Sequence, residues 1–205
     1  MTDPTDCCSP HQRLDQAIAV VQRHSFTALL TNPGTTRISD IAETASHEAI
    51  NVAEALAWLQ DHGRLERDGD HLVGAHGLTR RTTSHTLTID DRTLHTWCAY
   101  DAIAIPVTLG ITARASTKCP TCRTTLVIDI HDGALPNQTA IVLWMPSGPC
   151  DNVIKDFCSQ ANLFCAPGHL ATWRATMNHP PGEPLAFADI PALARRAWAD
   201  IAQKT

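Results

Sequence analysis

The hydrophobic pattern changes its period near residue 85, and this change limits the chain to few folds. Residues 14–30 carry apolar side chains at helical spacing, whereas residues 86–89 alternate polar and apolar side chains as a strand does. Later runs predict further strands at 111–116, 124–130 and 140–145, and helical segments in the first half of 149–164 and over 169–177 and 191–202. Helices that come first and are followed by a strand-rich region predict an α+β fold.

The first part of the chain has the layout of a winged helix. After the helix at 14–30, a short helix capped by Ser39 and a longer one capped by Ser46 are predicted, the latter running to Asp61. A turn at 68–70 then joins two short apolar runs, which predicts a hairpin. We expect a disordered tail over residues 1–12 and a winged-helix-like N-terminal domain over residues 13–80. This domain should pack on a β-rich α+β domain over residues 81–205.

Charge argues against a nucleic-acid partner. The formal net charge is -5, and the helix that would read DNA in a winged helix carries Glu48, Glu54 and Asp61 but no Lys or Arg. A recognition helix needs cations to contact phosphates. We therefore expect a structural role for the N-terminal domain and no binding to nucleic acid.

The cysteines and the N-terminus indicate a compartment. Residues 1–13 are polar and lack the apolar core of a secretory signal, and no run approaches the roughly 18 apolar residues of a membrane span. We expect a cytoplasmic protein without a membrane partner, whose eight cysteines are mostly reduced thiols. Cys7 and Cys8 lie in the predicted tail, where we interpret them as a solvent-exposed pair.

The run Trp97-Cys98-Ala99-Tyr100-Asp101 is the strongest functional signal. Residues three apart share one face of a helix, so the thiol of Cys98 and the carboxyl of Asp101 should enter the same pocket. A helix N-terminus at Cys98 would stabilise its thiolate, and Pro106 should end or kink that helix. A thiol can hold a soft metal and a carboxyl can move a proton. The alternative is a buried, inert cysteine beside a capping or surface carboxylate.

The remaining cysteines leave several pairings open. Cys158 or Cys165 could supply the second thiol of a two-coordinate soft-metal site, and spacing does not choose between them. The run Cys119-Pro120-Thr121-Cys122 is half of a zinc site. Cys150 and His131 could complete it, but we favour a local structural knuckle.

The chain resembles the organomercurial lyase (alkylmercury lyase) family. The similarity begins with the W-C-A-x-D pattern at 97–101, continues through 106–110, 112–116 and Cys119, and reaches the F-C pair at 157–158. It implies that Cys98, Asp101 and Cys158 are the catalytic set and that Cys119 is structural. It also implies a winged-helix-like N-terminal segment that does not read DNA. The chain departs from the family at Ser159, where a second cysteine is frequent, and at Tyr100, where leucine is common.

The resemblance also implies a reaction. The substrate would be an organomercurial, and protonolysis of its carbon–mercury bond would give a hydrocarbon and Hg²⁺. Cys98 and Cys158 would bind the mercury, with Asp101 beside it, and residues 81–205 would be the catalytic domain. No cofactor is implied, since Hg²⁺ is bound only as substrate and product. Cellular thiols or mercuric reductase would accept the Hg²⁺. Two other functions stay open: a metal- or redox-responsive transcription regulator and a non-catalytic thiol metal-binding protein.

Overall fold

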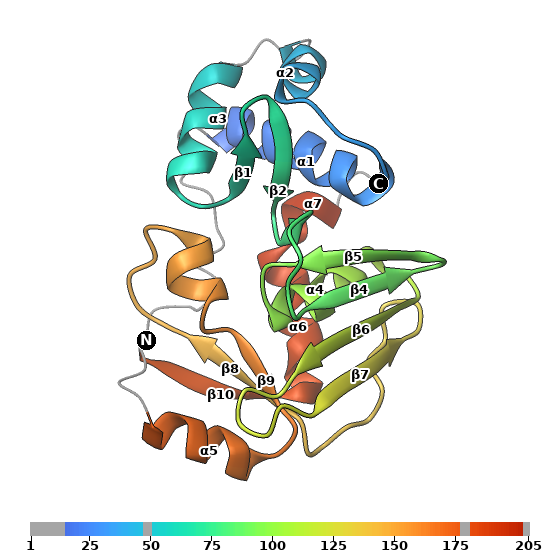
Figure 1. Ribbon diagram of the computed structural model, residues 1–205, viewed down its shortest axis with the longest axis vertical. Helices are drawn as coiled ribbons and strands as arrows, with labels where there is room; N and C mark the ends of the chain where they lie inside the picture. The colour runs from blue at the N-terminus through green and yellow to red at the C-terminus, as the bar shows by residue number, and fades with distance from the viewer. Residues whose placement is uncertain (1–14, 47–50, 177–180, 203–205) are drawn as a thin grey trace.

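The helical and the strand-rich parts of the chain lie at opposite ends of an elongated molecule (Figure 1). The computed structural model describes residues 15–46, 51–176 and 181–202. The tail predicted over residues 1–12 lies outside these ranges. The order of elements confirms the predicted α+β class: in the described part of the chain, three helices come first and all of the strands follow.

The N-terminal part contains α1 (Asp15–Thr31), α2 (Ile38–Ser46) and α3 (Val52–Asp61), followed by the hairpin of β1 (Leu65–Asp68) and β2 (His71–Ala75). Buried apolar side chains such as Ile18 and Leu59 form its core. Both predicted N-caps are wrong. Helix α2 already begins at Ile38, and the Ser39 hydroxyl donates to Asp70 Oδ2 at 2.9 Å. Asn51 caps α3, accepting from the Glu54 N–H at 3.2 Å.

One seven-stranded antiparallel sheet runs from the N-terminal hairpin into the second half of the chain, in the order β1-β2-β3-β5-β4-β6-β7. Its other strands are β3 (Leu78–Thr79), β4 (Thr86–Ile89), β5 (Arg92–Thr96), β6 (Ala113–Lys118) and β7 (Thr125–Ile130). The short strand β3 joins the two parts, because Thr79 is opposite Gly74 of β2 on one side and His95 of β5 on the other. Alternate residues of β6 and β7 are buried, as the period-two pattern requires.

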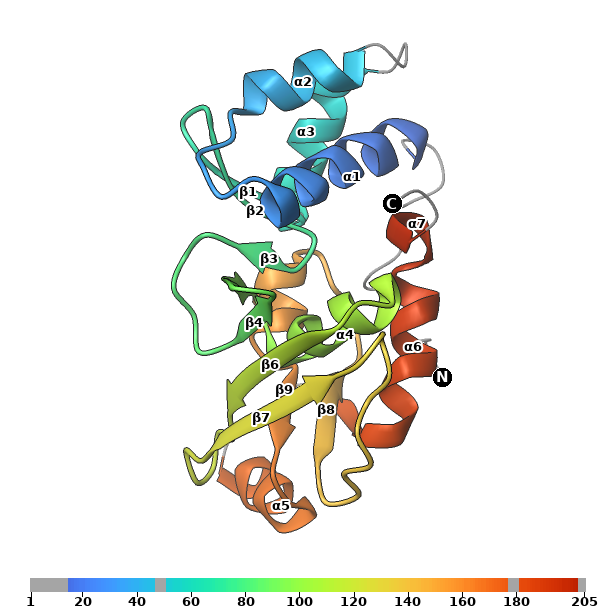
Figure 2. The ribbon, with the colours of Figure 1, turned by 90° about the vertical axis from the view of Figure 1, so that its right-hand side faces the viewer.

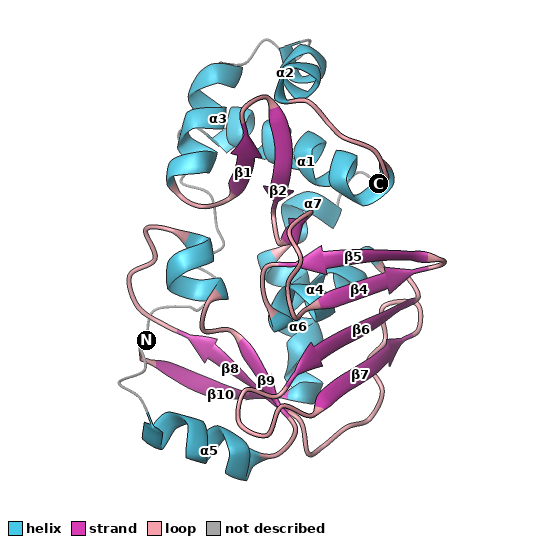
Figure 3. Cartoon of the chain, in the orientation of Figure 1, coloured by secondary structure: helices cyan, strands magenta, loops and turns pink. Residues whose placement is uncertain are grey.

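A second, three-stranded sheet has the order β10-β8-β9 and lies to the left of β6 and β7 in Figure 3. It contains β8 (Val142–Pro146), β9 (Asn162–Phe164) and β10 (Gly182–Ala186). Of these three strands, the sequence pattern predicted only β8, over residues 140–145. Strand β9 is three residues long, and β10 contains a glycine and a proline and has no buried residue, so neither shows the apolar alternation that marks a strand.

Helix α4 (Ala99–Leu109) forms the centre of the second half, and α6 (Ile190–Ala197) lies beside it (Figure 2). The other helices there are α5 (Pro167–Thr176), α7 (Ala199–Ala202), a 3₁₀ turn at Phe187–Asp189 and a π-helix at Val153–Cys158. Pro106 does not end α4, which continues to Leu109 and stops at Gly110 in the left-handed conformation (φ 65°). Burial of the helix on almost all sides offsets the roughly 3 kcal/mol that an interior proline costs.

Candidate active site

The N-terminus of α4 places a thiol against a carboxyl group. Cys98 is the N-cap, and its Sγ accepts a hydrogen bond from the Asp101 N–H at 3.4 Å. The same thiol donates to Asp101 Oδ2 at 3.1 Å. The Thr96 hydroxyl donates to the carbonyl of Cys98 at 2.9 Å, which fixes the backbone where β5 turns into the helix. The three-residue spacing therefore directs both side chains into one place, as helix geometry predicts.

Cys158 reaches the same carboxyl group from the other side. It is the last residue of the π-helix, and its Sγ donates to Asp101 Oδ2 at 3.7 Å. The neighbouring Phe157 contacts Tyr100 edge to face, with ring centroids 6.0 Å apart, and this contact packs the π-helix on α4. All three ligand atoms of Cys98, Asp101 and Cys158 lie within 4.8 Å of one another. The structure thus distinguishes Cys158 from Cys165, which spacing alone did not.

Burial sets the protonation of this group. The exposed fractions are 0% for Cys98, 5% for Asp101 and 6% for Cys158. Burial raises the pKa of the Cys98 thiol to about 11, so the expected stabilisation of its thiolate by the helix N-terminus is wrong: desolvation outweighs it. Burial also raises the pKa of Asp101 to about 6, although hydrogen bonds from both thiols oppose the shift. At neutral pH the resting site therefore holds a protonated Cys98 beside a largely ionised carboxylate.

A cavity of about 20 Å³ reaches Asp101. A space of this size holds roughly one water molecule. Trp97, which we had singled out, lines it, and its indole N–H donates to Glu66 Oε2 at 2.7 Å. Phe157, the first residue of the F-C pair, also lines it. The other lining residues were missed: Arg64, His76, Gly77, Val153 and Trp198. Burial, with a smaller contribution from Arg64, lowers the pKa of His76 to about 3, so this imidazole is neutral. No pattern in the sequence marks these residues, because they come from three distant segments.

Gly77 brings the backbone close to the carboxyl group of Asp101. Its φ of 87° lies in the left-handed region that favours glycine. A Cβ at this position would lie 2.9 Å from Asp101 Cγ and 2.9 Å from the Trp198 ring. Only a residue without a side chain fits between them.

A second cluster of soft ligands forms elsewhere, from Cys119, Cys122, Cys165 and His169. The CPTC run is therefore joined by Cys165 and His169 and not by Cys150 and His131, which were the suggested partners. The five cysteines at 98, 119, 122, 158 and 165 are in the reduced form, as expected. Cys150 is disulfide-bonded and is the exception among the described cysteines.

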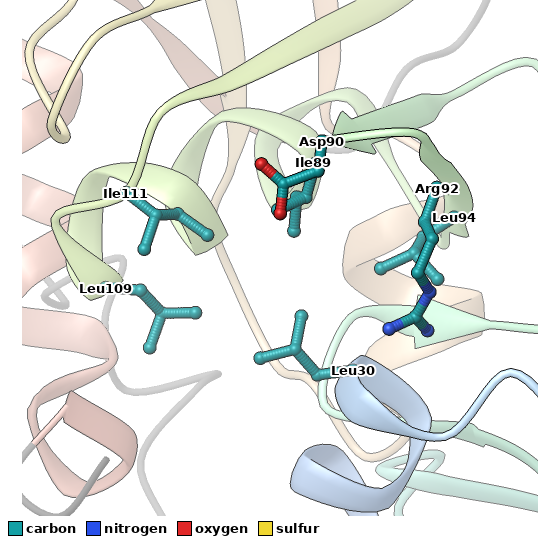
Figure 4. Close-up of a pocket in the computed structure, with 7 residues that line it drawn as sticks. All are labelled: Leu30, Ile89, Asp90, Arg92, Leu94, Leu109 and Ile111. Atoms are coloured by element: carbon teal, nitrogen blue, oxygen red, sulfur yellow. The ribbon is translucent and has the colours of Figure 1, made fainter.

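A larger apolar pocket, of about 370 Å³, lies between α1, the β4–β5 hairpin and the end of α4. Leu30, Leu109 and Ile111 face one another across it, and Asp90 and Arg92 supply its charged groups (Figure 4). None of the three predicted catalytic residues lines this pocket, and it contains no cysteine or histidine. Unlike the buried pair of Cys98 and Cys158, it offers no ligand for a soft metal.

Comparisons with known proteins identify the family of this chain. The family model described as MerB, alkylmercury lyase, matches residues 78–199. An alkylmercury lyase of Pseudomonas putida is 32% identical over 147 residues, which cover 66% of this chain and 67% of the relative. An alkylmercury lyase of Streptomyces lividans is 27% identical over 162 residues, covering 77% and 73% of the two chains.

A solved structure shows the same fold. It is a crystal structure of the mercury-bound form of MerB2, which matches with a TM-score of 0.78 and 18% identity. The match covers 93% of this chain and 92% of that one, so it includes the N-terminal helices as well as the strand-rich part. Since the family model spans more than half of the chain, and the buried Cys98, Asp101 and Cys158 lie within that span, this protein belongs to the alkylmercury lyase family.

Proposed function

We propose that this organomercurial lyase cleaves the carbon–mercury bond of its substrate with three residues. Cys98 and Cys158 bind the mercury, and Asp101 delivers a proton to the carbon. One observation supports this assignment above all others. A single carboxylate oxygen, Asp101 Oδ2, lies 3.1 Å from one sulfur and 3.7 Å from the other in a buried site.

Mercury binding must displace protons from the thiols. Thiolates are the ligands that select soft metals, and each thiol loses its proton when it coordinates one. With a pKa of about 11, Cys98 carries its proton at neutral pH, so the metal and not the solvent drives its ionisation. Asp101, with a pKa of about 6, is only about 10% protonated at pH 7. Its carboxylate is therefore ready to accept a proton from a neighbouring sulfur.

The proposed order of events must satisfy the proton balance. R–Hg⁺ and two thiols give R–H, Hg²⁺ held by two thiolates, and one proton. The substrate binds first to one sulfur, and the proton of that thiol leaves to solvent. As the second sulfur binds, its proton passes to Asp101 Oδ2 and from there to the carbon, while the carbon–mercury bond breaks. The second thiolate raises the electron density on the carbon, which makes the carbon a better proton acceptor.

The product determines the partners that we propose. Hg²⁺ held by two thiolates leaves by exchange onto other thiols, which we assign to cellular thiols or to mercuric reductase. We propose a cytoplasmic location, without a nucleic-acid partner and without a resident cofactor in this reaction. None of the helices in the described part of the chain has the length and apolar composition needed to cross a membrane. The family relationship does not favour the alternatives of a transcription regulator or a non-catalytic metal-binding protein.

Gas chromatography of the methane released from methylmercury tests the proposal, with excess thiol present to remove the product. Cys98→Ser and Cys158→Ser should each reduce methane release to background. Asp101→Asn should retain stoichiometric Hg²⁺ binding but slow methane release by about 10²–10⁴-fold, the usual contribution of a general acid. Asp91→Asn, an exposed aspartate in the turn between β4 and β5, is the matched control and should keep full activity. Full turnover by Cys158→Ser would show that the scheme with two thiols is wrong.

A further inference from the structure

Three cysteines and a histidine meet at one point away from the catalytic thiols. The ligand atoms of Cys119, Cys122, Cys165 and His169 all lie within 4.8 Å of one another. Cys122 Sγ lies 3.5 Å from Cys165 Sγ. His169 Nδ1 lies 2.9 Å from Cys165 Sγ and 3.8 Å from Cys119 Sγ. The proposed reaction uses none of these groups.

Two separate turns bring the four side chains together. Cys119 directly follows β6 and Cys122 shortly precedes β7, so both thiols lie in the connection of one hairpin. The Cys119 N–H donates to the carbonyl of Thr124 and the Arg123 N–H to that of Cys119, each at 2.9 Å, which closes this connection into a tight turn. Arg123 has a φ of 62°, the left-handed conformation that such a turn requires.

The other two ligands come from the junction between β9 and α5. Cys165 directly follows β9, and His169 lies in the first turn of α5, four residues further on. The Thr121 hydroxyl donates to the carbonyl of His169 at 2.8 Å and holds the two turns together. The cluster is therefore built by backbone geometry on both sides, and no long flexible side chain takes part.

The spacing of the ligands fits a tetrahedral zinc ion. Zinc–sulfur bonds of about 2.3 Å and zinc–nitrogen bonds of about 2.1 Å place tetrahedral sulfurs about 3.8 Å apart, and a sulfur about 3.6 Å from a nitrogen. The distances of 3.5 Å and 3.8 Å are close to these values, whereas the 2.9 Å sulfur–nitrogen distance must lengthen by about 0.7 Å to reach the tetrahedral value. A disulfide would need about 2.05 Å between Cys122 and Cys165, much less than the 3.5 Å found.

We propose that Cys119, Cys122, Cys165 and His169 form a structural Zn²⁺ site of the Cys₃His type. Four protein ligands leave no open position, which is typical of a structural and not a catalytic zinc. The ion would join the β6–β7 hairpin of the large sheet to the β9–α5 junction of the small one. Beside it lies a small core that includes Cys119, Trp144, Phe164 and Leu170.

Metal analysis of the full chain tests this site directly. Protein purified under reducing conditions from zinc-supplemented, mercury-free medium should contain about one zinc per chain by mass spectrometry. Cys122→Ser and His169→Ala should each lower the affinity for zinc by at least tenfold in a competition with a chromophoric chelator, since each removes one of four ligands. Cys158→Ser is the matched control: it removes a thiol of the other cluster and should retain the zinc.

Cobalt gives a second readout that does not depend on how the variants fold. Co²⁺ added to the metal-free wild-type chain should give the intense visible absorption of tetrahedral thiolate coordination, and one equivalent of Zn²⁺ should abolish it. A reduced wild-type chain that binds neither ion would overturn the proposal. So would zinc that is retained by Cys122→Ser and His169→Ala, or a Cys122–Cys165 disulfide in protein purified under reducing conditions. Because none of these measurements involves methane release, their outcome is independent of the proposed function.

Discussion

Asp101→Asn should stabilise the protein increasingly as the pH rises, although it removes the proposed proton donor. Burial raises the pKa of Asp101 from 3.8 to about 6. The folded protein therefore holds the proton of this carboxyl more tightly than the unfolded chain does. The contribution of this group to stability is fully present below the unfolded pKa and is lost as the pH rises through the folded pKa. A shift of about two pKa units corresponds to about 3 kcal/mol in total.

The magnitude can be isolated by comparing two proteins at two pH values. Between pH 4 and pH 8 the buried carboxylate should lower the free energy of unfolding of the wild-type protein by about 2.5 kcal/mol, the part of the total that falls in this window. Asparagine does not titrate, so the stability of the variant relative to wild type should rise by this amount over the same window. The effect of the amide on packing and hydrogen bonding does not depend on pH, so it cancels when the variant-minus-wild-type difference at pH 4 is subtracted from that at pH 8. The contributions of other titrating groups and of any bound metal are common to both proteins and cancel as well.

Urea unfolding under reducing conditions, at unit steps from pH 4 to pH 8, supplies the measurement. A difference between Asp101→Asn and wild type that stays constant with pH, or one that falls as the pH rises, would refute the reasoning. The carboxyl group would then not be destabilised by its burial, and a pKa near 6 could not be part of the mechanism.

Two further results are expected. The value of kcat/KM for methane release should fall about tenfold per pH unit below about pH 6, because a protonated Asp101 cannot accept a thiol proton. A profile of kcat/KM from pH 5 to pH 8 checks this. If kcat/KM fell above pH 6 instead, Asp101 would have to enter the reaction already protonated. Gly77→Ala should lower the free energy of unfolding by about 1–3 kcal/mol from backbone strain and by a further amount from the contact with Asp101. In urea titrations Gly69→Ala should lose only the stability that backbone strain removes, since its φ is 56° and nothing lies within 4 Å of the added Cβ. Equal losses of unfolding free energy in the two variants would exclude a contribution from the contact between the Cβ added at Gly77 and Asp101.

The sequence predicted those parts of the fold in which local pattern and tertiary packing agree. Strands β4, β6 and β7 have one buried face and therefore alternate, and the three N-terminal helices have apolar faces. The prediction failed where packing overrides local preference. Pro106 lies inside a helix because the surroundings bury it, and β10 is a strand because β8 offers it five pairing positions.

The candidate site could be predicted only in part, because tertiary packing and not local sequence brings most of its residues together. Cys98 and Asp101 are neighbours through helix geometry, so their spacing alone predicts that they meet. Cys158 enters from a π-helix 57 positions further along, and only the family resemblance distinguished it from Cys165. The partners of the CPTC run could not be found from spacing, because they depend on where β9 and α5 meet the hairpin. The raised pKa of Cys98 was missed because burial depends on the whole fold.

Strand β3 has a consequence for any attempt to divide this protein. It pairs with β2 on one side and with β5 on the other, so the sheet is continuous across the domain boundary predicted after residue 80. The turn just before β3 brings His76 and Gly77 to the cavity at Asp101. A fragment starting at residue 81 would leave β5 as an edge strand with one unpaired side, and such strands pair with other copies of the chain and promote aggregation. It would also lack His76 and Gly77, which line the cavity at Asp101. The winged-helix-like part therefore contributes residues to the proposed active site, and the two parts should be expressed together as one chain.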